Sequence, residues 1–296
     1  MIPSFPKIFA IGTRHVQNIF DDEVEISEKI DGSQFCFGKI NGTVYVRSKG
    51  AQLYFDNPEK MFLIAIDYIQ SIQERLPEGI IFYVEYLNKP KHNTLKYNRV
   101  PKNNLILFGI MSDTMVFDED LSYSADLLDI ETVPIIYKGK VGNAEYLKSM
   151  LERESVLGGC KVEGIVVKNY NRPFIINGMD VPIMSGKYVS EAFKEVHQNR
   201  RGTEEKGKNK LETFFESFRT EARWGKAIQH LRERGELENA PSDIGKLIKE
   251  VQSDIEEEEK ENIKDFLWKE FNGQLKRKAS AGVAEWYKNR LLNNSF

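Results

Sequence analysis

The chain contains 296 residues, of which 41% are hydrophobic and 29% are charged, and it carries a formal net charge of −3. This length suits two domains better than one, and the composition excludes a disordered or fibrous protein. Two cysteines, Cys36 and Cys160, cannot build a disulfide framework, so we expect a reducing compartment.

The N-terminal residues MIPSFPKIF lack the apolar core of a signal peptide, and no apolar run approaches membrane-spanning length. The sequence therefore predicts a cytoplasmic protein with no membrane partner. We also expect it to be a monomer.

The first two-thirds of the chain predict mixed α and β structure. Six segments rich in β-branched and aromatic residues are expected to form strands: residues 33–39, 43–48, 80–86, 105–111, 132–137 and 161–168. Asn41-Gly42 predicts a tight hairpin between the first two, because such a turn needs positive φ at both positions. Helices are expected at about 57–76 and 143–154, each opening on an asparagine as the capping residue.

One stretch of the chain, residues 89–102, is strongly basic. It contains six basic or histidine residues and no acid: Lys89, Lys91, His92, Lys96, Arg99 and Lys102. The offsetting acids lie elsewhere, for example in the run EEEEKE at 256–261. Such segregation is expected of a protein with one anion-binding face, although charge alone favours a solvated basic loop.

The composition changes after about residue 198. Residues 199–210 (NRRGTEEKGKNK) are almost wholly polar and predict a linker. Beyond it, apolar residues recur at spacings of three and four after Ser242, the expected N-cap of a helix. The aromatic residues of this part are expected to form its core, whereas its arginines fit a phosphate-binding face or a solvated face equally well. We expect an α+β domain at 1–198, a linker at 199–210 and a helical domain at 211–296.

Lys29 ends an extended segment just before a glycine turn, in the sequence EKIDGSQF. A lysine attacks phosphorus only as the free amine, so its pKa must be lowered by neighbouring cations or by desolvation. The short pattern K-x-D-G alone also fits a surface lysine beside an ordinary turn. An ordered series of nucleophile, arginine, acid, aromatic, acid and lysine nevertheless supplies what a nucleotide site requires: Lys29, Arg47, Glu85, Phe108, Glu163 and Lys187.

The segments around these residues resemble the motifs of a known superfamily. KIDGS, RSK, VEY, LFGI, EGIVVK and GKYVSEAF resemble motifs I, Ia, III, IIIa, IV and V of the covalent nucleotidyltransferases, which include DNA ligases, RNA ligases and mRNA capping guanylyltransferases. EKIDGSQF is most similar to RNA ligases that seal nicks in double-stranded RNA, the phage and kinetoplastid editing type. KPKHNTLKYNRVPK resembles the segment between motifs III and IIIa of viral and phage RNA ligases.

The resemblance spans residues 25–195 and implies a fold. We expect an α+β nucleotidyltransferase domain, ATP-grasp-like, with antiparallel sheets and flanking helices, followed by an all-helical C-terminal domain. It also implies roles around the nucleophile. Lys29 would accept AMP, Asp31 and Gln34 would shape the phosphate site and support end joining, and Arg47 would contact phosphate or the RNA end.

Other matching positions are implied to hold the nucleotide and a metal. Glu85 would bind the ribose hydroxyls, and Phe108 and Val166 would flank adenine. Lys187 would neutralise the α-phosphate. Glu163, together with Glu85, would hold Mg²⁺ or Mn²⁺. The nucleotide-binding set is completed by two further residues: Glu28 and Lys168.

Two positions depart from the family pattern. Motif V usually carries two lysines separated by one residue, but the second position here is Val189. Lys168 could take its place, although in a regular strand it points to the face opposite Glu163 unless a bulge forms at Gly164. Gln34 stands where close relatives often have asparagine, which preserves the amide.

The resemblance thus implies an ATP-dependent RNA ligase of RNA repair that joins RNA ends, in nicked or duplex RNA, through AMP bound covalently to Lys29. A DNA ligase or a capping enzyme is disfavoured, because Ser-Gln-Phe replaces an expected arginine after motif I and the C-terminus does not resemble an OB-fold. A non-catalytic RNA- or nucleotide-binding relative is the remaining alternative, which Val189 alone supports.

Overall fold

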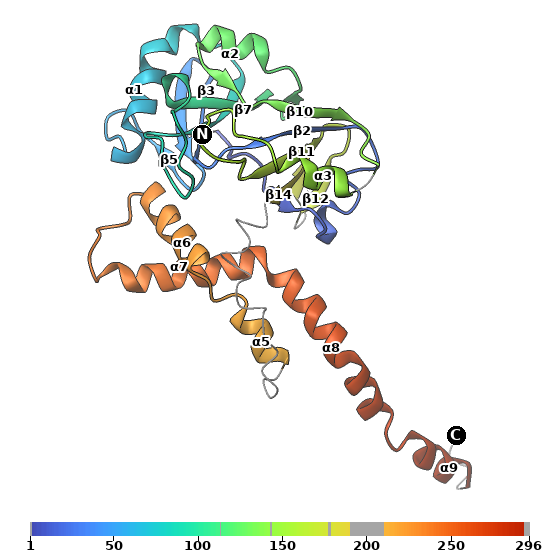
Figure 1. The fold of residues 1–296 in the computed structure, drawn as a ribbon. Coiled ribbons are helices and arrows are strands. Elements are labelled where there is room, and N and C mark those ends of the chain that lie inside the picture. Colours follow the sequence, from blue (N-terminus) through green and yellow to red (C-terminus); the bar gives the residue numbers. More distant parts are fainter. Residues whose placement is uncertain (1, 113, 143, 177–178, 190–209, 293–296) are drawn as a thin grey trace. The chain divides into compact units, whose positions relative to one another are not determined.

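The structure is a computed structural model that describes residues 2–112, 114–142, 144–176, 179–189 and 210–292 (Figure 1). The chain divides into two compact units, Met1–Leu247 and Ile248–Phe296. The predicted linker at 199–210 lies outside the described residues except for Lys210, so the predicted domain boundaries stay an expectation.

Sheet I, a five-stranded sheet, carries the predicted nucleophile at the end of a strand. In spatial order its strands are β1 (Phe9–Ala10), β14 (Met184–Val189), β11 (Gly164–Asn169), β2 (Val24–Lys29) and β10 (Ile135–Gly139). All neighbouring pairs are antiparallel except β1 with β14. Because β11 is buried along its whole length, both faces of this sheet are covered at its centre.

Sheet II holds the remaining long strands. Its order is β5 (Gln52–Leu53), β4 (Thr43–Ser48), β3 (Ser33–Ile40), β6 (Ile80–Tyr86), β7 (Leu105–Ser112) and β8 (Phe117–Asp118), with β9 (Glu131–Thr132) beside β7. A separate two-stranded sheet consists of β12 (Phe174–Ile176) and β13 (Met179–Val181).

The strand predictions at 33–39, 43–48, 80–86 and 105–111 are confirmed. The Asn41-Gly42 hairpin is also confirmed, with φ values of 51° and 74°. The predicted strand at 132–137 is instead divided between β9 and β10, because Pro134 lacks the N–H that a continuous ladder needs. The strand predicted at 161–168 begins only at Gly164.

The helices of the first unit are shorter than predicted. The first runs from η2 (Lys60–Phe62) through α1 (Leu63–Ile72) to η3 (Gln73–Arg75), and Glu59 before it is extended, so the expected start at residue 57 is wrong. α3 (Ala144–Met150) ends before residue 154, because Glu154 forms a β-bridge with Lys161; the expected cap at 143 lies outside the described residues. The other short helices are η1 (Arg14–Val16), η4 (Lys102–Asn104) and α2 (Ser122–Leu128).

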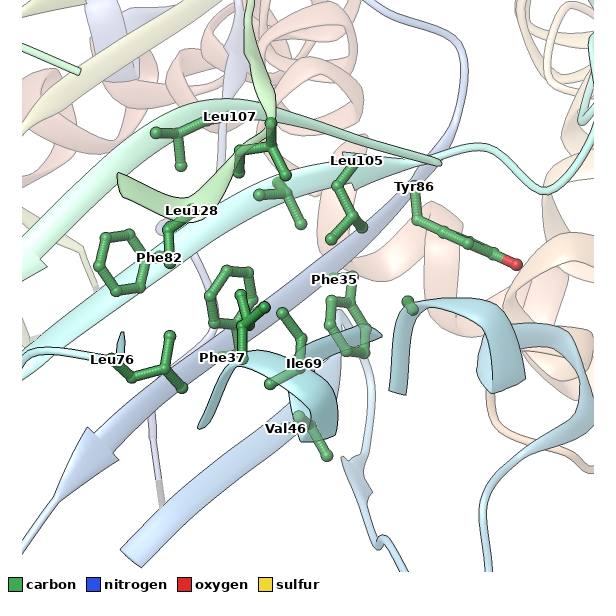
Figure 2. Packing of buried hydrophobic residues seen from close by; sticks show 14 of the residues in the cluster. Phe35, Phe37, Val46, Ile69, Leu76, Phe82, Tyr86, Leu105, Leu107 and Leu128 are labelled. Atoms are coloured by element: carbon green, nitrogen blue, oxygen red, sulfur yellow. The ribbon is translucent and has the colours of Figure 1, made fainter. Parts of the chain in front are cut away.

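Each main sheet packs one apolar face against helices. Figure 2 shows Phe35, Phe37 and Phe82 of sheet II packing toward Ile69 of α1 and Leu128 of α2. The rings of Phe37 and Phe82 stack with centroids 5.2 Å apart. The corresponding face of sheet I packs against α3. Because side chains alternate along a strand, the opposite face of sheet II carries a second set of side chains, of which Cys36, Ile81 and Tyr83 pack with Ile2 and Phe5 of the N-terminal segment.

The described residues of the C-terminal part form helices joined by turns. It contains α5 (Lys210–Glu216), α6 (Glu221–Glu233), α7 (Asp243–Glu258), α8 (Lys260–Ser280) and α9 (Val283–Leu292). α7 begins directly after Ser242, as predicted. The expected aromatic core is wrong: Trp268 and Trp286 are 60% and 57% exposed, because α8 and α9 bury none of their described residues.

The observed architecture is α+β, with antiparallel sheets, flanking helices and a helical C-terminal region, and it confirms the predicted fold class. Within the described part of the chain, every helix is too short or too polar to cross a membrane.

Candidate active site

Lys29 lies on the polar face of sheet I, and the strand register arranges its neighbours in three rows. The first row crosses the sheet from Lys29 over Gly164 to Val189. The second row runs from Ser27 over Val166 to Lys187. Val166 and Lys187 therefore lie one row, about 7 Å, from the predicted nucleophile. The third row runs from Glu25 over Lys168 to Ser185. This face thus carries four of the predicted nucleotide-binding residues, whereas Ile26 and Ile165 point from the other face into the core.

The ammonium of Lys29 forms an ion pair with Glu163, with Nζ 2.7 Å from Oε2. Desolvation is the largest single influence and lowers the pKa of Lys29, but the negative charges of Glu163, Glu85 and Asp31 outweigh it. The net pKa of Lys29 is raised. We expected a lowered pKa; in the free protein the carboxylates hold the lysine as an ammonium instead.

Asp31 is fixed by a segment far away in sequence. Its Oδ2 accepts hydrogen bonds from the backbone N–H groups of Thr94 and Leu95, at 2.8 and 2.7 Å. Its own N–H donates to the hydroxyl oxygen of Tyr97 at 2.8 Å. Asn93 donates to the carbonyl oxygen of Gly32 at 2.7 Å. The turn that follows Lys29 is therefore held at both its side chain and its backbone.

Gly32 allows sheet II to approach this turn. A Cβ atom at this position would lie 2.7 Å from Cγ of Glu85 and 2.8 Å from the carbonyl oxygen of Tyr86. Any other residue would force these strands apart. The glycine of the turn thus places Glu85 beside the Lys29 segment.

Glu85 projects from β6 on the face of sheet II that does not pack against α1. Desolvation and the nearby carboxylate of Glu163 raise its pKa to about 8, although Lys29 acts in the opposite direction. Gln34 lies directly opposite Glu85 on β3 and donates to Ser4 Oγ at 2.9 Å. Predicted residues from both sheets thus surround Lys29.

Glu28 points to the other side of β2. It is 3% exposed, and its Oε2 accepts a hydrogen bond from the N–H of Val156 at 3.0 Å. Burial raises the pKa of this carboxyl group. Its Oε1 is buried and has no hydrogen-bond partner among the described residues. Such an orphaned acceptor is costly unless a ligand or a water molecule satisfies it.

Arg47 is engaged by backbone carbonyl groups. Its guanidinium donates to the carbonyl oxygens of Ile2 at 2.8 Å, Ser48 at 3.0 Å and Lys49 at 3.3 Å. The arginine therefore fastens the N-terminal segment to β4, and its contact with phosphate or RNA stays a prediction.

Phe108 and Lys168 connect the two sheets. Nζ of Lys168 donates to the carbonyl oxygen of Phe108 at 2.5 Å and lies 3.5 Å from Oε1 of Glu25. Tyr170 donates to the same carboxylate oxygen at 3.2 Å. The ring of Phe108 meets that of Phe5 edge-on, with centroids 5.1 Å apart. Lys168 therefore holds the backbone of the residue expected to stack on adenine.

Lys168 is poorly placed to replace the missing lysine of motif V. It lies in the third row of sheet I, between Glu25 and Ser185. That row is about 13 Å along the strand from the Lys29 row. β11 pairs with both neighbours without a register shift, so the bulge that the prediction required at Gly164 is not formed.

Comparison with known proteins identifies the family. Residues 22–189, more than half of the chain, match the family model described as RNA ligase. The chain belongs to the RNA ligase family.

Solved structures similar to this RNA ligase family member include forms of the Naegleria gruberi RNA ligase. The form with PPi is 18% identical, with a TM-score of 0.46, and the match covers 68% of this chain and 61% of that chain. A variant with ATP and Mn is 15% identical, with a TM-score of 0.47 and coverages of 67% and 58%. The chain thus spans about three-fifths of the length of the structures that it matches. No curated protein sequence matches it.

The family member offers two carboxylates to a metal ion. Among the described residues, no group of three or more His, Cys, Asp and Glu side chains is arranged to hold one. Glu85 and Glu163 nevertheless concentrate negative charge beside Lys29. Mg²⁺ is often bound by one or two carboxylates together with phosphate oxygens and water, so this pair fits such an ion.

Sequence reasoning missed the hydrogen bonds that 93–97 makes to the Lys29 turn. Asp31 lies 63 residues before Thr94, and no periodicity marks so distant a contact. The run KPKHNTLKY marks this segment by its charge and its resemblance, but neither property indicates the amide and hydroxyl groups that make the contacts.

Proposed function

We propose that this chain is an ATP-dependent RNA ligase that joins RNA 3′-hydroxyl and 5′-phosphate ends through AMP carried on Lys29. The observation that supports this most directly is the ion pair between Lys29 and Glu163, with Glu85 and Asp31 close enough to affect the lysine. Membership of the RNA ligase family supports the reaction class.

The reaction proceeds in three balanced steps. The amine of Lys29 attacks the α-phosphorus of ATP, an N–P bond forms, and the bond to pyrophosphate breaks. AMP then passes to an RNA 5′-phosphate, which forms a phosphoanhydride and frees the lysine. Finally a 3′-hydroxyl attacks that 5′-phosphorus and expels AMP. Positioning and charge stabilisation carry most of the acceleration, so no separate general base is assigned.

The side chains around Lys29 have distinct tasks in this scheme. Lys187 neutralises the α-phosphate, one row away from the nucleophile. Phe108 and Val166 flank adenine, and the unpartnered Oε1 of Glu28 is available to a donor. Glu85 binds the ribose. Arg47, Asp31 and Gln34 serve the end-joining steps.

Mg²⁺ or Mn²⁺ belongs beside Glu85 and Glu163. Bound there, the ion would offset their negative charge and thereby favour the free amine of Lys29 over the ammonium. The positive charge of such an ion would counteract the carboxylates that raise the pKa of Lys29 in the ligand-free protein. We further propose that the protein acts as a monomer in the cytoplasm, on nicked or duplex RNA during RNA repair.

The decisive experiment is labelling with α-labelled ATP and Mg²⁺, read on a denaturing gel, for the wild type and Lys29→Ala. We expect a covalent band from ATP in the wild type that is absent from the variant, and no band from α-labelled GTP. Matched nicked duplexes of RNA and DNA then test the substrate, with RNA sealed in preference. Wild-type protein that stays unlabelled even after pyrophosphate treatment, which removes any AMP already bound, would refute the proposal.

A further inference from the structure

The basic stretch at 89–102 contains two kinds of cation. Arg99 forms a two-pronged ion pair with Glu131, at 2.7 and 2.8 Å, and Lys102 pairs with Asp129. The charges of these two residues are largely neutralised. They are therefore poor candidates for a binding surface.

Lys89, Lys91 and Lys96 differ from these two residues. All three are exposed, and none forms an ion pair with the residues that the structure describes. Their charge is available to an outside partner. Since the whole chain has a net charge of −3, a polyanion must be attracted by such a local patch rather than by the protein as a whole.

The segment that carries these lysines also touches the nucleophile turn. Thr94 and Leu95 donate to Asp31, only two residues after Lys29. His92 lies with Nε2 3.0 Å from Oγ of Ser33 in the same turn. These contacts hold the turn, and the exposed lysines flank the residues that make them: Lys89 and Lys91 precede residues 92–95, and Lys96 follows.

We propose that Lys89, Lys91 and Lys96 form a phosphate-binding surface for the RNA strand whose 5′ end receives AMP. This inference rests on the proposed function. Compact ammonium groups suit phosphates as point charges, and contacts of this kind position a strand without reading its sequence. The segment that carries the three lysines is hydrogen-bonded to the Asp31 turn, so a strand bound on it lies near Lys29.

A triple variant, Lys89→Ala/Lys91→Ala/Lys96→Ala, tests the surface in the full-length chain. Its matched control removes three exposed lysines elsewhere that likewise form no ion pair with the described residues: Lys60→Ala/Lys140→Ala/Lys148→Ala. Both variants lose the same charge. The dissociation constant of a 5′-phosphorylated RNA is measured by fluorescence anisotropy over a series of salt concentrations, without ATP.

We expect the first variant to bind RNA about tenfold more weakly. The slope of the logarithm of the association constant against the logarithm of the salt concentration should become less steep by about 2, since each lost single-strand phosphate contact removes about 0.7 from that slope. The control keeps the wild-type slope. A Lys→Arg triple at the three positions also retains the slope, which separates lost charge from lost folding. Equal slopes in the first variant and the control would overturn the proposal.

The triphosphate of ATP is the competing source of phosphate. If the three lysines served it instead, the first variant would raise the KM for ATP in Lys29 labelling and leave RNA binding unchanged, which also overturns the proposal. Failure of the ligase function has a different signature. In that case Lys29 is never labelled, whereas RNA binding still depends on the three lysines.

Discussion

The pKa of Glu85 shows how closely ionisable groups are gathered at this site in the ligand-free protein. Its pKa of about 8 arises from desolvation and from nearby carboxylates, chiefly Glu163, against the attraction of Lys29. The same carboxylates raise the pKa of Lys29. In the ligand-free protein, the raised pKa of Lys29 favours the ammonium over the nucleophilic amine, and the raised pKa of Glu85 favours the protonated acid over the carboxylate. The shift at Glu85 leads to a prediction about stability.

We predict that the free energy of unfolding of the ligand-free protein falls between about pH 4.5 and 8 because of Glu85. The pKa of this group is raised from 4.5 to about 8 in the folded protein, so folding favours its protonated form. Its contribution is fully present below pH 4.5 and is lost as the pH rises through 8. Urea denaturation at several pH values checks this, and Glu85→Gln should flatten the decline.

Glu131→Gln provides the matched control for that measurement. The hydrogen bond to Arg99 lowers the pKa of Glu131, so its contribution is present above its unfolded pKa and is lost toward low pH. This variant should leave the decline at higher pH intact. If wild type and Glu85→Gln declined in parallel from pH 5 to 8, Glu85 would not be the group responsible.

Among the strands of sheet I, Lys29, Gly164 and Val189 lie in one row, which bears on the lysine missing from motif V at position 189. Gly164 has no side chain, so a lysine at position 189 would share a row with Lys29 with no side chain between them. We predict that Val189→Lys increases the single-turnover rate of Lys29 adenylylation by about tenfold, because a second cation stabilises the developing phosphate charge.

Val189→Met is the control for that variant, since it adds a long side chain without charge. It should leave the rate close to that of the wild type. An unchanged rate in Val189→Lys, in protein of wild-type thermal stability, would mean that position 189 does not face the phosphate.

Sequence patterns predicted the central strands well, because aromatic and β-branched residues mark β3, β4, β6 and β7 directly. They did not predict which strands become neighbours. β11 pairs with both β2 and β14, and these pairings create the three rows. Because the paired strands are far apart in sequence, no single segment indicates its partner. For the same reason the distant location of Lys168 was missed, although its motif was recognised.

The site predictions followed the same division. The resemblance selected Lys29, Glu85 and Glu163, which the structure brings together. It could not anticipate that Arg47 would be occupied by backbone carbonyls, because Ile2 belongs to an N-terminal segment without any motif and the carbonyls of Ser48 and Lys49 are reached only through the local backbone conformation. Chemistry-bearing residue types were therefore predictable, whereas their present partners depended on packing.

At the scale of the whole molecule, every predicted site residue lies between Glu28 and Lys187, within the first compact unit. The two sheets of that unit have separate hydrophobic cores and meet at the candidate site. α8 and α9, by contrast, contain no buried residue among those described. The stability of the part that holds the candidate site should therefore depend little on these two helices.

We predict that a chain ending at Glu259, which lacks α8 and α9, keeps Lys29 adenylylation within about twofold of the full-length rate, a change well below 1.4 kcal/mol in activation free energy. The physical reason is that hydrophobic stabilisation scales with apolar area buried, and none of the described residues of these helices is itself buried. Labelling and thermal unfolding, measured together, check this. A chain ending at Phe218 also loses α6, whose Ala227 and Leu231 are each 2% exposed, and it should unfold at a lower temperature. If the chain ending at Glu259 were stably folded yet unlabelled, α8 and α9 would have to act in the nucleotide step itself.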